Sequence, residues 1–471
     1  MEILLFIENI IEKVSSFGDA IFFFNVTGVA RYKVPFLIAW ITVFGIYCTV
    51  KFRFINVRYF IKSLKMMASS KIDNAQKKQR NFFNLSTSRR ILLTGIGEAI
   101  DVSAIFGITT AVIIAGPGVL FWMLVAGFIS MPIKFLEISL GCITRKMDKQ
   151  NQCVIGGPSR YIEVMFRCIK QKRLGKIIAI AFSFCVMIST FFSLQINQTM
   201  NVVRHIFDIS DLASLQITSI VALLIMLIIL TGFNSITKIS SRIVKVMSIL
   251  YVFVCFAIVV VNFENFTHAI SLIFSEAFTF RAVEGSIIYA SIVGLKRIYF
   301  SCDVGQGISS IIHINTLNKN PIQEGIISMS AVTIITLISV FCSGLIVVIT
   351  GSYLSNIDSM GAVISAFDTV HPFLKYTLFA VVPMFAITTA VAWGYCGQNA
   401  WKNIFGIKTV YIYNCLLFVA YVFCGTTRDF RKILDIADIF NFSITVPNII
   451  ALFIGANFVQ KRYRKYRDGL F

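Results

Sequence analysis

The sequence predicts an all-α integral membrane protein with about 11 transmembrane helices. Of its 471 residues, 57% are hydrophobic and only 14% are charged, whereas soluble globular chains carry about 25% charged residues. Its apolar segments also reach the length of about 20 residues that a helix needs to cross a bilayer. This composition excludes a soluble enzyme of the ordinary kind. The predicted spans are 34–50, 91–114, 118–143, 176–200, 215–232, 243–263, 286–312, 323–350, 373–400, 408–424 and 432–456.

The basic residues are distributed unevenly along the chain and predict its orientation. The net charge is +20, which in a soluble protein would raise the question of a nucleic-acid partner. In a membrane protein it reflects the Lys and Arg residues of cytoplasmic loops, and here most of them fall on one side, chiefly in 51–90, 145–176 and the tail after 460. We therefore expect the N-terminus outside and the C-terminus in the cytoplasm. The alternative interpretation is that the basic residues of the 51–90 loop and the tail contact anionic lipid.

The spans divide into two blocks of similar length, which predicts an inverted repeat. Spans 2 to 6 cover 91–263 and spans 7 to 11 cover 286–456. Because each block holds five spans, the two blocks must have opposite orientations in the membrane. Around them we expect an extracytoplasmic interfacial segment at 1–33 without a cleaved signal peptide, a first span with a basic cytoplasmic loop at 34–90, and a basic cytoplasmic tail at 457–471.

The cysteines and histidines do not indicate a cofactor. Most of the 11 cysteines lie in apolar runs without a C-x-x-C pair, and the four histidines are scattered without metal-ligand spacing. The spans also carry no nucleophile with a base beside it. We therefore expect no cofactor and no enzymatic activity.

The opening helix of each block is interrupted by polar residues. Span 2 carries Glu98 and Asp101 among glycines, and span 7 carries Asp303 between Ser301 and Gly305. A carboxylate at membrane depth costs about 2.5–3.5 kcal/mol or more, so it is expected to face protein or a water-filled cavity. Neighbouring glycines let the helix unwind, which exposes N–H and carbonyl groups to a substrate carboxylate and a cation. The two breaks predict a central site for a small zwitterion and an ion; buried structural carboxylates are the alternative.

Two further pairs of polar residues lie inside predicted spans. Lys134 and Glu137 are three residues apart on one helix face, which predicts an internal ion pair that ties span 3 to its bundle. Thr388 and Thr389 in span 9 offer hydroxyl groups to a hard cation, although a Thr hydroxyl in a helix commonly bonds its own backbone.

A series of motifs along nearly the whole chain resembles the alanine/glycine:cation symporter family. The matching segments, in order, are GIYCTVKFRFINVRYF (45–60), AGPGVLFWM (115–123) with Lys134 and Glu137 after it, GGP (156–158), FSCDVGQG (300–307) with His313 after it, Trp393, and ADIFNFSITVPN (437–448). The fold that this resemblance implies is the leucine-transporter-type five-plus-five inverted repeat with one extra N-terminal span.

The departures from the family pattern fall at the two breaks. Where family members usually carry GTGNIAG, this chain has DVSAIFG from Asp101 to Gly107, and the family's Asn, Glu and Leu in span 7 are replaced here by Cys302, Asp303 and Gln306. Thr388 and Thr389 keep both hydroxyl groups of the pair that helps to hold sodium in this fold. The resemblance thus implies a sodium site beside a rewritten substrate pocket. Asp101 could replace a lost sodium ligand, pair with a substrate amino group or carry a coupled proton.

The resemblance implies a secondary active transporter of the cytoplasmic (inner) membrane, which imports alanine, glycine or a similar small neutral amino acid with sodium by alternating access. The alternatives are a proton-coupled amino acid symporter and a degenerate paralogue that senses or binds without transport. Expected partners are the amino acid, sodium or a proton, and membrane lipid, with no nucleic acid. Sodium is expected at Ala99, Val102, Thr388 and Thr389. The expected substrate-binding residues are Asp101, Ser103, Ala104, Gly107, Phe300, Ser301, Cys302, Asp303, Gly305 and Gln306.

Overall fold

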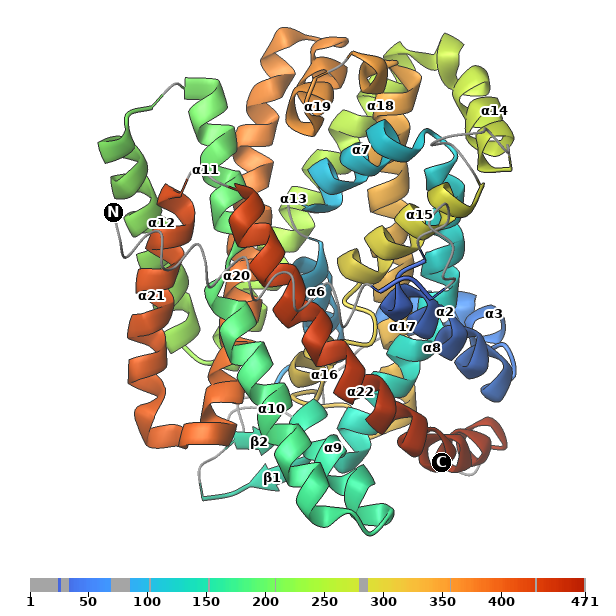
Figure 1. Ribbon diagram of the computed structural model, residues 1–471, viewed down its shortest axis with the longest axis vertical. Coiled ribbons are helices and arrows are strands. Elements are labelled where there is room, and N and C mark those ends of the chain that lie inside the picture. The colour runs from blue at the N-terminus through green and yellow to red at the C-terminus, as the bar shows by residue number, and fades with distance from the viewer. Residues whose placement is uncertain are drawn as a thin grey trace.

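The computed structural model describes residues 24–26, 34–68, 85–100, 103–150, 153–207, 209–278, 287–355, 357–427 and 430–469. Across these ranges the chain is helical except for one short hairpin and the connections (Figure 1). Eight of the described helices or continuous helix pairs are long and apolar enough to cross a membrane, and the bent pair α6 (Ser88–Ala99) and α7 (Ser103–Ala115) adds a ninth. The structure therefore confirms an all-helical integral membrane protein. The count of 11 spans and the inverted repeat stay predictions.

The other helices and strands complete the chain in the following order. The α-helices are α2 (Phe36–Lys51), α3 (Ile55–Arg58), α4 (Phe60–Ala68), α8 (Val119–Thr144), α9 (Pro158–Cys168), α10 (Lys172–Phe191), α11 (Leu194–Phe207), α12 (Asp211–Leu230), α13 (Phe233–Val261), α14 (Phe266–Ala277), α15 (Ile287–Ser301), α16 (Ile308–His313), α17 (Pro321–Leu337), α18 (Leu345–Ile349), α19 (Ser359–Asp368), α20 (Lys375–Phe405), α21 (Val410–Thr426) and α22 (Phe430–Arg467). Short 3₁₀ turns are η1 (Phe263–Asn265), η3 (Ser352–Leu354), η4 (Pro372–Leu374) and η5 (Ile407–Thr409), and η2 (Ile338–Gly344) is a π-helix. Strands β1 (Lys146–Asp148) and β2 (Cys153–Ile155) pair antiparallel, with Met147 opposite Val154.

Local sequence explains where several of these helices begin and end. Asn320 caps α17 by accepting hydrogen bonds from the N–H groups of Ile322 and Gln323, and Pro321 occupies the first helical position, where no N–H is needed. Gly406 ends α20 with a φ of 82°, a left-handed conformation that glycine adopts without steric cost.

Two further predicted spans, besides the interrupted spans 2 and 7, differ from a single straight α-helix. Span 4 is interrupted at 192–193, between α10 and α11, although neither glycine nor proline lies there. Span 8 passes through the π-helix η2, where the hydroxyl groups of Tyr251 and Ser343 lie 3.0 Å apart. Both features alter helices that line or support the centre of the molecule, and the apolar pattern alone does not reveal them.

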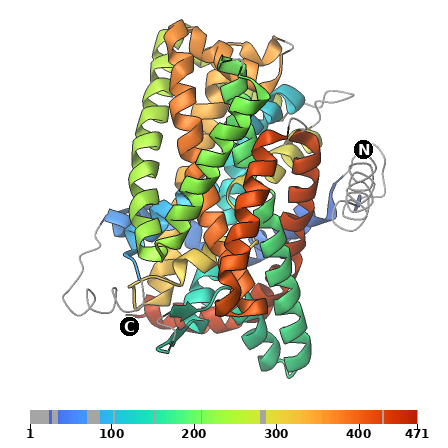
Figure 2. The ribbon, with the colours of Figure 1, turned by 90° about the vertical axis from the view of Figure 1, so that its left-hand side faces the viewer.

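The helices form an inner group surrounded by an outer one. Of the most apolar stretch within Pro321–Ile349, 78% is buried inside the protein, compared with 28% for α12, so α17 lies centrally and α12 lies at the periphery. Helix α22 crosses the bundle diagonally in Figure 1. The hairpin and α9 lie at the same end of the molecule as the C-terminus, while α14, α18 and α19 lie at the opposite end (Figures 1 and 2).

Candidate functional site

The chain between α15 and α16 unwinds near the centre of the bundle. Asp303, Gly305 and Gly307 all have positive φ angles, of 47°, 75° and 86°, which only glycine adopts readily. The carbonyl groups released from the helix find donors elsewhere: Lys134 Nζ donates to the Asp303 carbonyl at 3.1 Å and Asn448 Nδ2 to the Gly305 carbonyl at 2.7 Å. Buried backbone groups need such partners, so the break is held from α8 and from α22.

Gly307 is required by packing as well as by its backbone angle. A Cβ atom at this position would lie 2.3 Å from Pro158 Cγ, far inside van der Waals contact. Tyr161, one turn further along α9, donates a hydrogen bond to Asn448 Oδ1. The Gly-Gly-Pro segment, α9 and α22 thus form one support beneath the break.

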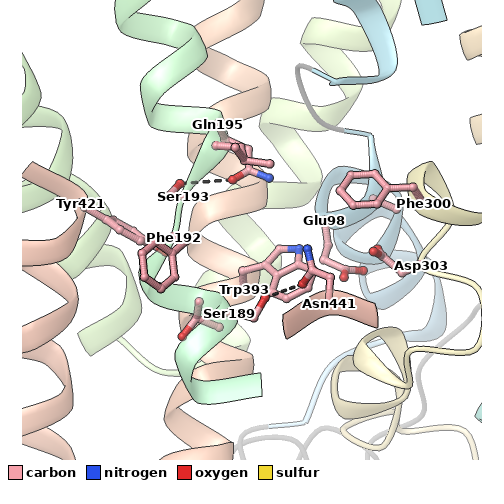
Figure 3. Close-up of a pocket in the computed structure, with 13 residues that line it drawn as sticks. Glu98, Ser189, Phe192, Ser193, Gln195, Phe300, Asp303, Trp393, Tyr421 and Asn441 are labelled. Carbon is pink, nitrogen blue, oxygen red and sulfur yellow. Dashed lines mark hydrogen bonds between the residues drawn. The ribbon is translucent and has the colours of Figure 1, made fainter. Parts of the chain in front are cut away.

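Two carboxyl groups, one from each interrupted helix, lie at the centre. Glu98 lies in the last turn of α6 and Asp303 in the break of span 7, and both line the same cavity (Figure 3). Both residues are buried, with 1% and 6% of their surfaces exposed. Because two bare carboxylates repel each other, this arrangement needs a positive charge or a proton between them.

A serine and a lysine connect the same two helices. Ser309 Oγ donates to Glu98 Oε2 at 3.2 Å and accepts from Lys134 Nζ at 2.8 Å. No ion pair joins Lys134 to Glu137 among the described residues, so the expected pair within α8 is not formed. The Lys134 side chain reaches instead into the break of span 7, where the unwound backbone offers a carbonyl.

Glu137 lies beneath the same break. Its carboxylate is directed towards the N–H groups of Gly305 and Gly307, but neither oxygen makes a hydrogen bond of standard geometry. Within the described chain, three buried carboxyl groups (Glu98, Glu137 and Asp303) therefore surround the single ammonium group of Lys134. A proton or a further cation would offset this excess of carboxyl groups.

Glu98 and Asp303 line a small central cavity with a volume of about 30 Å³, enough for about two water molecules. The cavity lies between the two interrupted helices and the interruption of span 4 (Figure 3). Its other lining residues are Ala99, Ser189, Thr190, Phe192, Ser193, Leu194, Gln195, Phe300, Trp393, Tyr421 and Asn441. Acidic and hydroxyl groups beside aromatic rings suit a small polar solute that carries a positive group.

Two larger cavities lie towards the ends of the molecule. One, of about 280 Å³, reaches Ser359 on α19 and shares Phe300 and Leu194 with the central cavity. The other, of about 420 Å³, lies between the hairpin and the end of α20 and includes Asn315 and Lys402. Phe300 and Leu194 therefore separate the central cavity from the end that carries α19.

Oxygen atoms converge where α6 ends against α20. Thr389 Oγ1 donates to the carbonyl of Gly97 at 2.9 Å and lies 3.5 Å from that of Ile100. Thr388 Oγ1 instead bonds the carbonyls of Met384 and Phe385 in its own helix. Carbonyl and hydroxyl oxygens are the ligands that a hard cation such as sodium prefers. Of the predicted threonine pair, only Thr389 donates a hydrogen bond to span 2 among the described contacts.

The predicted site residues fall into three groups. Phe300, Asp303 and Ala99 line the central cavity, and Gly107 lines the larger cavity beside it. Ala104, Ser301, Cys302 and Gln306 are buried without lining any of the three cavities, and Gly305 shapes the break. Asp101, Val102 and the side chain of Ser103 lie outside the described residues.

Several lining residues were not predicted from the sequence. Ser189, Ser193 and Tyr421 lie in apolar segments that showed no charged interruption, and Asn441 belongs to the motif at 437–448 but had no predicted place in the site, so only the fold brings these residues to the cavity. Glu98 did carry a signal, since a buried carboxylate within a span is costly, but it was not among the predicted site residues.

An all-helical membrane protein whose interrupted helices enclose a small polar cavity belongs to the class of transporters. Comparison with known proteins identifies the family: residues 21–470 match the model of the sodium:alanine symporter family, and the chain belongs to that family. It is therefore a transporter and not an enzyme.

Three relatives illustrate the range of the family. The sodium/alanine symporter AgcS of Methanococcus maripaludis is 27% identical over 92% of this chain and 94% of its own length. The amino-acid carrier protein AlsT of Bacillus subtilis is 26% identical over 90% and 87%. The probable sodium/glutamine symporter GlnT of Bacillus subtilis is 24% identical over 91% and 87%. The family-level function is thus symport of sodium and an amino acid across a membrane.

Proposed function

We propose that this protein imports a small neutral amino acid, alanine or glycine, together with sodium across the cytoplasmic membrane. The observation that carries the proposal is the carboxyl pair of Glu98 and Asp303, which lines a central cavity of about 30 Å³ between the two interrupted helices. Their negative charge suits the ammonium group of an amino acid, and the small volume favours a short side chain.

The remaining parts of the substrate have complementary groups nearby. The first turn of α7, from Ser103 to Gly107, carries the partial positive charge of a helix N-terminus, which favours the substrate carboxylate. Phe300 and Trp393 contribute aromatic surface beside the cavity. In this arrangement the substrate lies between the helix terminus and the carboxyl pair, so both of its charges are neutralised.

Sodium is proposed to bind where α6 meets α20. Thr389 Oγ1 and the carbonyls of Gly97 and Ile100 supply oxygens there, together with the expected carbonyl groups of Ala99 and Val102. A cation at this position stabilises the end of α6, which also carries Glu98. Sodium binding thereby favours the conformation that binds substrate, and this differential affinity is the source of coupling.

The direction of transport follows from the proposed orientation. With the C-terminus, the hairpin and α9 in the cytoplasm, the cavity of about 280 Å³ opens towards the outside and the cavity of about 420 Å³ towards the inside. Alternating access then opens the central cavity to each of them in turn, with Phe300 and Leu194 closing the outer side.

Uptake by proteoliposomes tests this proposal. Purified full-length protein is reconstituted, and accumulation of labelled alanine, glycine and glutamine is measured under an inward sodium gradient, an inward proton gradient, or neither. We expect sodium-driven accumulation of alanine and glycine, with glutamine poorly transported because the cavity is small. Accumulation driven only by protons would overturn sodium coupling. No accumulation by folded protein would overturn the proposed substrate class.

A further inference from the structure

The structure brings together two basic segments that lie at opposite ends of the sequence. After α2 the chain continues through α3 and α4, and the last turns of α22 pack against this region. Gln460 Nε2 donates to the Lys51 carbonyl at 3.0 Å. The ring of Tyr463 is 2% exposed and contacts the rings of Phe52, Tyr59 and Phe135, at centroid distances of 6.2, 6.1 and 5.7 Å. The basic tail is thus anchored beside the first helices.

This contact produces a surface with a strong excess of positive charge, which we call the basic surface. Among the described residues 51–68 and 457–469, one residue, Asp468, is acidic, and it pairs with Arg467 at 2.9 Å. The basic side chains of the surface are Lys51, Arg53, Arg58, Lys62, Lys65, Lys461, Arg462, Arg464, Lys465 and Arg467. Such a concentration of like charge is unfavourable unless anions lie against it.

Aromatic rings and a strained turn hold these cations in place. The Lys62 ammonium group lies 5.2 Å from the ring of Tyr59 and 5.9 Å from that of Tyr466, so it joins the two segments. Arg53 and Phe54 have φ angles of 54° and 55°, and left-handed non-glycine residues cost about 1–3 kcal/mol each. Packing of Phe52 into the core supports this turn.

An apolar stripe runs beside the cations. Val50 of α2, Phe54 of the left-handed turn, Val57 of α3 and Ile61 of α4 are 62%, 54%, 59% and 65% exposed. Helix α2 also exposes Val43 and Ile46. A helix with exposed apolar residues on one side and lysines on the other lies in the membrane interface, with its apolar face among the acyl chains.

We propose that the basic surface formed by α3, α4 and the end of α22 binds the headgroups of anionic phospholipids. Phosphate groups neutralise the cations, which far outnumber the acidic residues of the described surface, while the apolar stripe contacts the acyl chains of the same lipids. Bound lipid fastens the C-terminal turns of α22 to the first helices. This binding is independent of which solute the protein transports.

The chain offers a matched control for the test. The turn between α9 and α10, together with the helix ends on either side, lies at the same end of the molecule as the C-terminus (Figure 1). It carries five exposed basic residues, Arg167, Lys170, Lys172, Arg173 and Lys176. This segment carries five cations, compared with ten on the basic surface, and each variant below removes four of them. The test variant replaces Lys62, Lys65, Arg464 and Lys465 with Gln, and the control variant replaces Lys170, Lys172, Arg173 and Lys176 with Gln.

Binding is measured with full-length protein in detergent, titrated with phosphatidylglycerol or phosphatidylcholine, by native mass spectrometry and by the thermal unfolding midpoint. We expect phosphatidylglycerol to bind and to raise the midpoint, the test variant to bind it at least about tenfold more weakly, and the control variant to retain binding. A second variant exchanges Lys and Arg at the same four positions (Lys62→Arg, Lys65→Arg, Arg464→Lys, Lys465→Arg). Because it keeps the positive charge, it should bind phosphatidylglycerol as the unmodified protein does. This comparison separates loss of charge from misfolding.

Three outcomes would overturn the proposal. Equal loss in the test and control variants would indicate general attraction to positive charge. An equal effect of phosphatidylcholine would show that the headgroup charge has no role. A similar stabilisation by inorganic phosphate without lipid would show that the surface binds a free anion.

Discussion

The two interrupted helices that bound the central cavity are held differently by the described residues beside their breaks. In span 7 the backbone itself is adapted: three left-handed residues, two of them glycines, form the break, and its carbonyls are bound by Lys134 and Asn448. In span 2 the described residues on either side show no left-handed conformation, and the end of α6 is held by a hydroxyl group, that of Thr389.

This difference separates a structural role from a binding role. The break of span 7 is fixed by strong, buried contacts, which suits a part of the site that stays rigid. The end of α6 has a hydrogen bond from Thr389 of α20 and the carboxyl group of Glu98, whose Oε1 atom accepts no hydrogen bond from the described residues. A cation that binds there adds contacts where the protein has few, so we expect span 2 to respond to the ion and span 7 to position the substrate.

The largest expected effect concerns Lys134, which bonds the break of span 7 and is connected to Glu98 of span 2 through Ser309. Lys134→Met leaves the Asp303 carbonyl without this donor and three carboxyl groups without the cation among them, and removal of a buried charge partner typically costs about 3–5 kcal/mol. We expect uptake to be lost and the thermal unfolding midpoint to fall sharply. Lys134→Arg, which keeps the charge, serves as the control and should retain most stability. Unchanged stability of Lys134→Met would contradict the role given to this residue.

The rigidity of span 7 is tested at Gly307. Gly307→Ala combines a left-handed backbone with a Cβ atom 2.3 Å from Pro158 Cγ. Gly406→Ala is the matched control, because Gly406 has a φ of 82° but no atom within 4 Å of an added Cβ. Overpacking should therefore make Gly307→Ala less stable than Gly406→Ala by about 1–3 kcal/mol, measured by thermal unfolding in the same detergent. Equal stability of the two variants would show that α9 moves away without cost.

The carboxyl pair is tested by replacing each member with its amide. Asp303→Asn keeps the left-handed backbone, which Asn tolerates, and Glu98→Gln keeps an acceptor for Ser309. Each change removes one negative charge from the cavity, so we expect uptake to fall by about ten- to a hundredfold at low substrate concentration. Glu163→Gln on the surface of α9 is the control. In the proteoliposome assay, normal uptake by both amide variants would exclude the pair from the site.

The sequence predicts the break of span 7 better than the rest of the site. Gly305 and Gly307 indicate it because glycine in an apolar helix marks a place where the backbone can unwind. The interruption of span 4 has no such signal: Phe192 and Ser193 are ordinary helix residues, and the break exists only through tertiary packing. Ser189 and Asn441, which are hydrogen-bonded to each other at the cavity edge, were therefore not predicted.

The partners of charged residues also could not be predicted from the sequence. A spacing of three residues correctly places Lys134 and Glu137 on one face of α8, but the acceptors for Lys134 come from residues 303 and 309, far along the chain. Likewise, both basic segments of the basic surface are visible in the sequence, yet their contact depends on the direction in which α22 crosses the bundle. Long-range partners follow from the fold and not from local pattern.

The smallest expected effect compares two adjacent threonines. Thr389 Oγ1 reaches the carbonyls of span 2, whereas Thr388 Oγ1 bonds only its own helix among the described contacts. Thr389→Val removes one oxygen from the proposed ion site, and we expect the sodium concentration for half-maximal uptake to rise about tenfold, the equivalent of one hydrogen bond. Thr388→Val makes the same change of shape, and in this variant the sodium concentration for half-maximal uptake should stay within about twofold of the original value. An equal shift in both variants would place the ion elsewhere. No shift in either variant would mean that the contact between α20 and span 2 is purely structural.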